Sequence, residues 1–209
     1  MNSTLPGTVL PLPEVLPERP FSLLEPVFAV SGGGLLLSQV TELTGLSPAT
    51  VQNWVKRGWV SAPVNKRYGE RQVARILLIN LLRPAMRLDQ IASLLRYVNG
   101  SVDDRTDDIL PDDQLYNWLC TATLRLREES ALNHEFVTTL IEALLEGYEG
   151  PVPDAKERLS HALTIMLLNV AAAALMQEAD TLMAREVSPD ESPVPRNHGS
   201  SPAKNKRKV

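Results

Sequence analysis

The 209-residue chain is 44% hydrophobic, with a formal net charge of −4 and a pI near 5.5, so it can bury a core and is not a disordered chain. Its single cysteine, Cys120, excludes an internal disulfide framework, and its three histidines are too widely spaced along the chain to suggest a metal site. No carboxylate pair, nucleophile elbow or phosphate-binding loop stands out. We therefore expect neither an enzyme nor a bound cofactor or metal.

Residues 1–34 predict an arm rather than a domain. Six of the 16 prolines lie within the first 30 residues, which forbids a long helix there. The arm is expected to be irregular and partly mobile, and to pack partly on the body through apolar anchors at Leu23, Leu24, Val27 and Phe28. The sequence SGGG at 31–34 predicts a flexible joint. Because this N-terminus has no basic region before an unbroken apolar run, we expect a cytoplasmic protein without a secretory signal.

Two short helices are predicted next, joined by a tight turn. Ser38 is expected to cap the first helix, which ends at Gly45, and Ser47 to cap the second, with Pro48 in its first turn. Apolar residues recur at helical spacing through both helices and predict a small shared core, formed by Val40, Leu43, Leu46, Val51, Trp54 and Val55. Polar residues of the second helix are left toward solvent, where they form a candidate reading surface: Thr50, Gln52, Asn53, Lys56 and Arg57.

After Gly58, the stretch WVSAPVNKRYGE favours a small hairpin or an extended loop, with a turn at Asn65. Helical spacing then returns in ERQVARILLINLL and, after an interruption at Pro84, in RLDQIASLLRYV. The unit is expected to span residues 35–100.

Residues 101–187 predict a helical second region. It opens with an acidic, turn-like linker over 101–111 and continues with a helix that starts at an Asp cap in DDQLYNWL, a helix from Asn133, and a long helix over 154–186. The apolar run 162–176 is shorter than the roughly 20 residues that span a bilayer, so a buried helix is expected and no membrane contact. The tail, 188–209, is rich in Pro and Ser, ends in basic residues, and is expected to be disordered.

The acidic net charge hides a strong asymmetry along the chain. Residues 38–100 hold nine Lys and Arg against three acidic residues, whereas 101–187 hold six against seventeen. A chain polarised in this way can present its basic part to a phosphate backbone and keep its acidic part away from it. The alternative is that these cations lie on ordinary solvated helix faces.

These residues also carry a family resemblance. The run LLLSQVTELTGLSPATVQNWVKRGWV, followed by KRY and QVARILLINLLRPAMRLDQIASLL, resembles the winged helix-turn-helix of the MerR-type transcriptional regulators over about residues 35–98. More narrowly, VQNWVKRGWVSAPVNKRYGERQVARILLINLLRPAMRLDQI and the helical region after it are similar to the bacterial domain-of-unknown-function family eighteen-thirty-six, which is regarded as MerR-like. The resemblance implies an all-α fold with a small β wing, a helical C-terminal region, and double-stranded DNA as the ligand.

The resemblance also implies roles for individual residues. Thr50 stands where the MerR pattern has a phosphate contact, and Lys56 and Arg57 form its basic helix end. The wing contacts find counterparts in Arg67 and Tyr68, with Lys66 beside them.

Two departures from the MerR pattern change what is expected. Gln52 replaces the usual base-side Arg, and with Asn53 it favours adenine over guanine. A linker and three helices replace the long antiparallel coiled-coil helix through which MerR regulators dimerise, so metal or drug sensing is not implied.

The resulting hypothesis is a sequence-specific, dimeric transcriptional regulator in which residues 35–100 bind DNA and 101–187 dimerise or sense an effector. A different class of function stays open, that of a protein–protein interaction adaptor built on a helix-turn-helix fold. Two side-chain alternatives stay open as well: Trp54 and Trp59 stack on bases or form core, and Cys120 is a redox sensor or a small buried residue.

Overall fold

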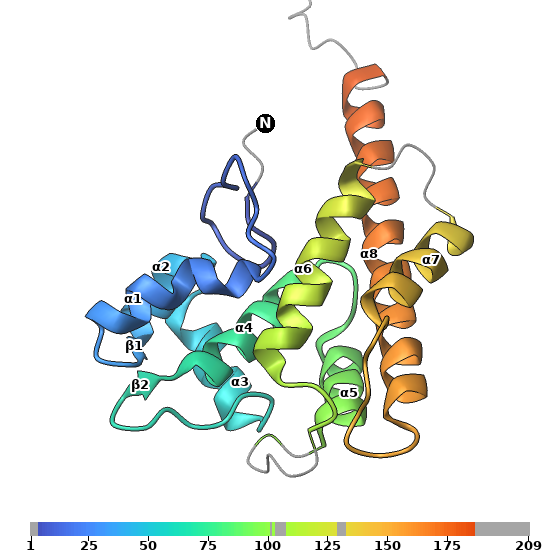
Figure 1. Cartoon of the computed structure of the whole chain (residues 1–209). Helices are drawn as coiled ribbons and strands as arrows, with labels where there is room; N and C mark the ends of the chain where they lie inside the picture. Colours follow the sequence, from blue (N-terminus) through green and yellow to red (C-terminus); the bar gives the residue numbers. More distant parts are fainter. Residues whose placement is uncertain (1–3, 101, 103–107, 129–132, 187–209) are drawn as a thin grey trace, which may run out of the picture.

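The computed structural model describes residues 4–100, 102, 108–128 and 133–186, and these are mostly helical, as the all-α class requires. The elements shown in Figure 1 are, in chain order, the 3₁₀ helix η1 (Pro20–Leu24), α1 (Glu25–Val30), β1 (Leu35–Leu36), α2 (Leu37–Thr44), α3 (Pro48–Lys56), β2 (Arg67–Tyr68), α4 (Glu70–Leu82), α5 (Leu88–Asn99), α6 (Asp112–Glu128), α7 (His134–Leu144) and α8 (Ala155–Glu186). The expected disorder of 188–209 and most of the expected linker lie outside the described residues.

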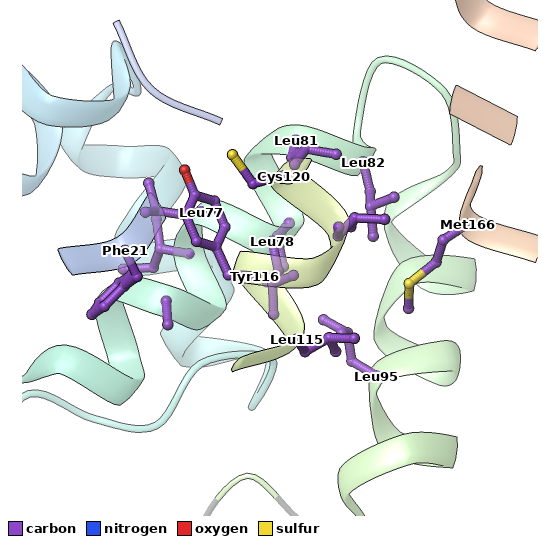
Figure 2. Close-up of a cluster of buried hydrophobic side chains, with 14 of the residues drawn as sticks. Phe21, Leu77, Leu78, Leu81, Leu82, Leu95, Leu115, Tyr116, Cys120 and Met166 are labelled. Carbon is purple, nitrogen blue, oxygen red and sulfur yellow. The ribbon is translucent and has the colours of Figure 1, made fainter. Parts of the chain in front are cut away.

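Helix α4 is the centre of the fold. All seven of its residues from Val73 to Ile79 are buried, and a helix that is buried on every side must have neighbours on every side. It packs most extensively against α6 and also contacts α2, β2 and α5. Figure 2 shows this centre, where Leu77 and Leu78 of α4 meet Tyr116 and Leu115 of α6. The core therefore runs without a break across the boundary expected near residue 100.

The N-terminal segment is part of this core over its described residues, 4–34, which confirms the expected packing of the arm on the body, while its partial mobility stays a prediction. Phe21 is 3% exposed, and its backbone N–H donates to Asn117 Oδ1 at 2.7 Å. The hydroxyl of Tyr116 donates to the carbonyl of Pro6 at 2.8 Å, and its ring meets that of Phe21 edge-on at 5.9 Å. Of the expected anchors, Leu24 and Phe28 are buried, Leu23 is half-buried and Val27 is exposed.

Helices α2 and α3 are joined by the turn Gly45–Leu46–Ser47. Gly45 has φ +68°, and a Cβ there would lie 2.9 Å from Val9. Both the left-handed backbone conformation and the lack of space therefore favour glycine. The expected cap at Ser47 is confirmed, since its hydroxyl accepts the N–H of Thr50 at 3.2 Å. The small core that α2 and α3 were expected to share is present, with Val55 only half-buried.

The expected cap at Ser38 is wrong. Helix α2 begins at Leu37, and its N-cap position is Leu36. The side chain of Gln39 reaches back instead and accepts the N–H of Leu36 at 2.8 Å, which satisfies the helix start without a hydroxyl.

The stretch after Gly58 forms the expected hairpin. Its turn has Asn65 at φ 51° and Lys66 at φ 63°, and backbone hydrogen bonds join Val64 and Arg67 in both directions, at 3.0 and 2.9 Å. Positive φ at both central residues is the turn geometry that matches the twist of a two-residue hairpin. β2 then pairs antiparallel with β1.

Arg67 ties the hairpin to the turn that precedes β1. Its Nη1 donates to the carbonyls of Ser31 and Gly34, at 2.8 and 2.9 Å. A Cβ on Gly34 would lie 3.0 Å from the Cβ of Arg67, so the backbones approach closely here. Residues 31–34, expected as a flexible joint, are thereby held in place.

A buried ion pair joins the two regions expected on either side of residue 100. Arg75 of α4 is 4% exposed and donates through Nε to Asp112 Oδ2 of α6 at 2.8 Å. Asn99, at the end of α5, donates to the other oxygen of Asp112 at 3.1 Å and accepts the N–H of Leu110 at 3.3 Å. Asp112, the first residue of α6, is thus an ion-pair partner in the core.

Helix α8 has two unlike halves, which corrects the expectation that the apolar run 162–176 is buried throughout. Through Ala171 it packs on α5, α6 and α7, whereas Leu175 and Met176 are 50% and 69% exposed. Its C-terminal half projects past the body (Figure 1). By length and composition α8 is the one described helix able to span a membrane, with 33% of its most apolar stretch buried.

Cys120 is buried in α6 beside Tyr116, and burial raises the pKa of its thiol to about 12. A thiol with so high a pKa remains protonated near neutral pH and is a poor nucleophile. The buried position agrees with the interpretation of Cys120 as a small apolar core residue.

We expect Asp112→Asn to lower the free energy of unfolding by about 3–5 kcal/mol, because it leaves the buried Arg75 guanidinium without a counter-charge. Guanidinium titration followed by circular dichroism measures this loss. Asp89→Asn is the matched control, since Asp89 pairs with Arg87 on the surface, where the two side chains are 63% and 75% exposed. Equal losses in the two variants would show that the Arg75–Asp112 pair is not a buried interaction.

We expect Arg67→Met to destabilise the protein by about 2 kcal/mol, because the carbonyls of Ser31 and Gly34 lose a charged donor. Lys66→Gln changes the exposed neighbour and should leave the midpoint of denaturant unfolding unchanged. The same denaturant titration checks both variants. A midpoint that moves for Lys66→Gln and not for Arg67→Met would contradict the assigned role of Arg67.

Candidate nucleic-acid interface

The exposed side of α3 carries four of the eight residues expected to bind DNA. Val51 and Trp54 are buried against α2 and α4, and the helical repeat therefore turns the remaining positions outward. The outward set is fully exposed and consists of Gln52, Asn53, Lys56 and Arg57. This side of α3 has two neutral amide side chains followed by two cations.

The N-terminal end of α3 is fixed by its own side chains. Thr50 is half-buried, and its hydroxyl lies 2.8 Å from that of Ser47, with either group able to donate. Ser47 also accepts the N–H of Thr50, so the first turn is closed locally. Thr50 lies beside the reading residues and retains only partial access to solvent.

The C-terminal end of α3 is ordered by stacking. The Arg57 guanidinium lies 5.1 Å from the ring centroid of Trp59, within cation–π range, and its Nε donates to Asn53 Oδ1 at 3.4 Å. Trp54 is a core residue, 1% exposed, and Trp59 is half-buried. The pairing of Arg57 with Trp59 was not expected from the sequence. An arginine two residues before an aromatic residue at the end of a helix could have indicated this cation–π contact.

The hairpin divides the other three expected residues. Lys66 is exposed at the tip, in the turn described above. Arg67 is half-buried, with its guanidinium on the Ser31 and Gly34 carbonyls, and Tyr68 is 3% exposed in the core, where burial raises its pKa. The structure therefore places Tyr68 out of reach of a ligand and gives Arg67 a structural contact.

The basic charge of residues 38–100 is smaller at the surface than the sequence suggests. Arg75 is buried on Asp112, and Arg71 lies 3.0 Å from Asp108. Arg87 pairs with Asp89. The two regions expected to keep their opposite charges apart are instead joined by ion pairs between them. Exposed cations remain at the end of α3 and at the hairpin tip, and also at Arg83 and Arg96.

In the described part of the chain, no group of three or more His, Cys, Asp or Glu side chains could hold a metal ion.

The sequence comparisons agree with the narrower of the two resemblances. Residues 29–119 match the family model described as "Domain of unknown function (DUF1836)", a segment that runs from α1 into α6 and includes α3 and the hairpin. A curated relative from Bacillus subtilis (strain 168), described as "Uncharacterized protein YkrK", is 26% identical over 129 residues. These residues cover 60% of this chain and 52% of the relative, so the match spans about half the length of that protein. No solved structure matches the chain. From α1 to the middle of α6, the chain is thus similar to a family whose function its description leaves unknown.

Proposed function

We propose that the protein binds double-stranded DNA sequence-specifically and regulates transcription, with α3 in the major groove. The observation that carries this proposal is the outward side of α3, where two amides and two cations stand exposed on a helix anchored by Val51 and Trp54. A helix fixed on one side and polar on the other is what major-groove reading requires. The arrangement of α2, α3 and the hairpin supports the MerR-like winged helix-turn-helix as its architecture.

Each exposed residue has a distinct role in this proposal. Gln52 and Asn53 can each accept from and donate to adenine, so they are the proposed base readers. Lys56 and Arg57 are the proposed phosphate contacts at the helix end, and stacking on Trp59 limits the conformations that Arg57 must lose on binding. Thr50 is proposed as a further phosphate contact at the helix start.

At the hairpin tip, Lys66 is the proposed wing contact. Its positive φ places it at the apex of a two-residue turn, where it lies apart from the core. Arg67 supports the wing by holding the carbonyls behind it. One tip cation rather than two is then available to neutralise phosphate.

A homodimer is proposed through one side of α8, from its middle to near its C-terminal end. Apolar residues repeat there at alternating spacings of three and four, the spacing of a coiled-coil seam. The seam consists of Ile165, Leu168, Ala172, Leu175, Ala179 and Leu182, and all but the half-buried Leu168 are exposed. Two-fold pairing along this seam supplies two copies of α3, as two DNA half-sites require.

The C-terminal half of α8 carries polar residues. They favour a protein partner over a lipid bilayer for the seam, and a cytoplasmic location is proposed with it. Gln177, Glu178, Asp180 and Arg185 are exposed on it, and charges in a bilayer core are costly. A protein partner covers the seam and leaves these groups in water.

A protein–protein adaptor is the second candidate, and one observation favours it. Val64 of the hairpin is 69% exposed and Leu36 of β1 is 41% exposed. Exposed apolar side chains such as these can pack against a protein partner but not against a phosphate backbone. Selection of a preferred sequence from random duplex DNA distinguishes the two functions, since an adaptor selects none.

Gln52→Ala and Asn53→Ala are each expected to cost about 1–3 kcal/mol on the preferred DNA site and less on random DNA. Selection of a site from a random duplex library, followed by fluorescence anisotropy, measures both. Gln114→Ala, an exposed glutamine on α6, is the matched control and should change neither affinity. Selection that enriches no sequence would favour the adaptor.

The salt dependence tests the tip cation. Lys66→Gln is expected to lower the log–log slope of affinity against salt by about one unit, because one phosphate contact is lost. Lys156→Gln on α8 carries the same charge change away from α3, and its slope should equal that of the wild type. If the two slopes fall equally, the hairpin tip makes no phosphate contact.

Leu175→Asp is expected to convert the dimer to a monomer at micromolar concentration, because it places a charge in the seam. Sedimentation velocity of the full chain gives the mass directly. Thr181→Asp adds the same charge off the seam and should leave the dimer intact. A wild-type monomer, or dissociation of both variants, would refute the seam.

A further inference from the structure

A groove open to solvent runs between α5 and the first half of α8. Part of it has a volume of about 590 Å³ and is lined by Leu94 and Tyr97 of α5 and by His161, Thr164 and Ile165 of α8. Tyr97 is 43% exposed and Ile165 is 44% exposed, so two large apolar side chains of one groove lie open to water. A groove between two packed helices with apolar residues in its walls fits the apolar side of a third helix.

The groove is continuous with the seam proposed for the homodimer, because Ile165 belongs to both. A second cavity of about 450 Å³ shares Leu94, Tyr97 and Ile165 with the first and extends the groove along α8 to Asn169. The seam residues that follow Ile165 lie on the same side of the helix. A partner helix that covers the seam at Ile165 must therefore contact α5 as well.

The sizes of the seam residues favour an antiparallel partner helix. In an antiparallel pair centred on the middle of the seam, the facing residues are Ile165 with Leu182, Leu168 with Ala179, and Ala172 with Leu175. Each alanine then faces a leucine, so large and small residues fill the seam evenly. A parallel pair in register would instead place alanine against alanine at positions 172 and 179.

The charges on the two parts of this surface favour the same orientation. Residues 87–99 and 155–169, which form the sides of the groove, together carry four Lys and Arg against two Asp and Glu. Residues 172–185, in the projecting half of α8, carry one against two. An antiparallel pair brings these parts of opposite net charge together, whereas a parallel pair brings like charges together.

We propose that the projecting end of α8 from a second copy of this chain covers the α5–α8 groove, in antiparallel pairing. This inference rests on the homodimer of the proposed function and names the surfaces that each copy contributes. Leu182 of the partner subunit then lies on Ile165, beside Leu94 and Tyr97. Figure 1 shows the two parts that the pairing joins, which are the half of α8 beside α5 and the half that projects past the body.

Disulfide cross-linking of the full chain tests the orientation. The variants Ile165→Cys and Leu182→Cys, made different in mass by a tag on one of them, are oxidised with diamide separately and after subunit exchange in a mixture. We expect a linked dimer from the mixture and none from either variant alone, because only unlike positions face each other. Thr181→Cys, off the seam, is the control and should not link to Ile165→Cys. The buried Cys120, with its raised pKa, stays unreactive.

Tyr97→Asp tests the groove itself, because it places a charge where apolar residues of the partner pack. We expect the dissociation constant of the dimer, measured by sedimentation, to rise at least tenfold. Ala143→Asp adds the same charge at an exposed position on α7 and should leave the constant unchanged. Both positions are exposed, and far-UV circular dichroism equal to that of the wild type shows that neither change acts through the fold.

A linked dimer from either cysteine variant alone would show a parallel pair and overturn the proposal. An unchanged dissociation constant for Tyr97→Asp would overturn it as well, because the groove would then lie outside the interface. A wild-type monomer would remove the homodimer and this pairing together and leave the DNA-binding proposal standing. Cross-links in the mixture alone, without selection of any DNA sequence, would support the pairing and remove the DNA-binding function.

Discussion

The fold depends on an ionised carboxylate held inside an apolar core. Asp112 receives Arg75 from α4 and Asn99 from α5, so the first residue of α6 fixes three helices at one point. Burying two charges costs free energy, so such a pair adds little net stability. Its effect is to fix the relative positions of the helices that carry it. Apolar residues could hold α4 against α6 in several registers, whereas one carboxylate with two defined donors selects one. Helix α3, the proposed DNA-reading helix, is positioned by the same core, because its Val51 and Trp54 pack into the core that has α4 at its centre.

From that fixed core, the surface divides into regions of different chemistry. The amides and cations of α3 and the hairpin tip lie at one end of the molecule, and the projecting half of α8 lies at the other (Figure 1). The proposed DNA contacts and the proposed subunit contact therefore do not compete for the same surface.

Local sequence signals predicted local structure well and tertiary placement poorly. The Ser47 cap, the Asn133 cap and the hairpin at Asn65 follow from short-range rules, and the structure has all three. The same rules could not show that Arg67 and Tyr68 turn inward, because their surroundings come from residues more than 30 positions away. An apolar anchor at Leu24 was expected, but local signals could not show that it and Phe21 pack on α6, a partner that lies far along the chain. The number of cations can be counted from the sequence. The burial of Arg75, which takes it off the surface, depends on its ion pair with Asp112.

The N-terminal segment has a consequence for the order in which the chain folds during synthesis. Pro6 and Phe21 are made well before their hydrogen-bond partners, Tyr116 and Asn117, which follow 110 and 96 positions later. At roughly 5–20 residues per second, the ribosome takes about 5–20 s to supply that partner helix. Before then the segment can already contact α2 and α4, through the bond from Val9 N–H to the carbonyl of Leu43 and that from Asn80 to the carbonyl of Gly7. Its contacts with Tyr116 and Asn117 form only after α6 has left the ribosome.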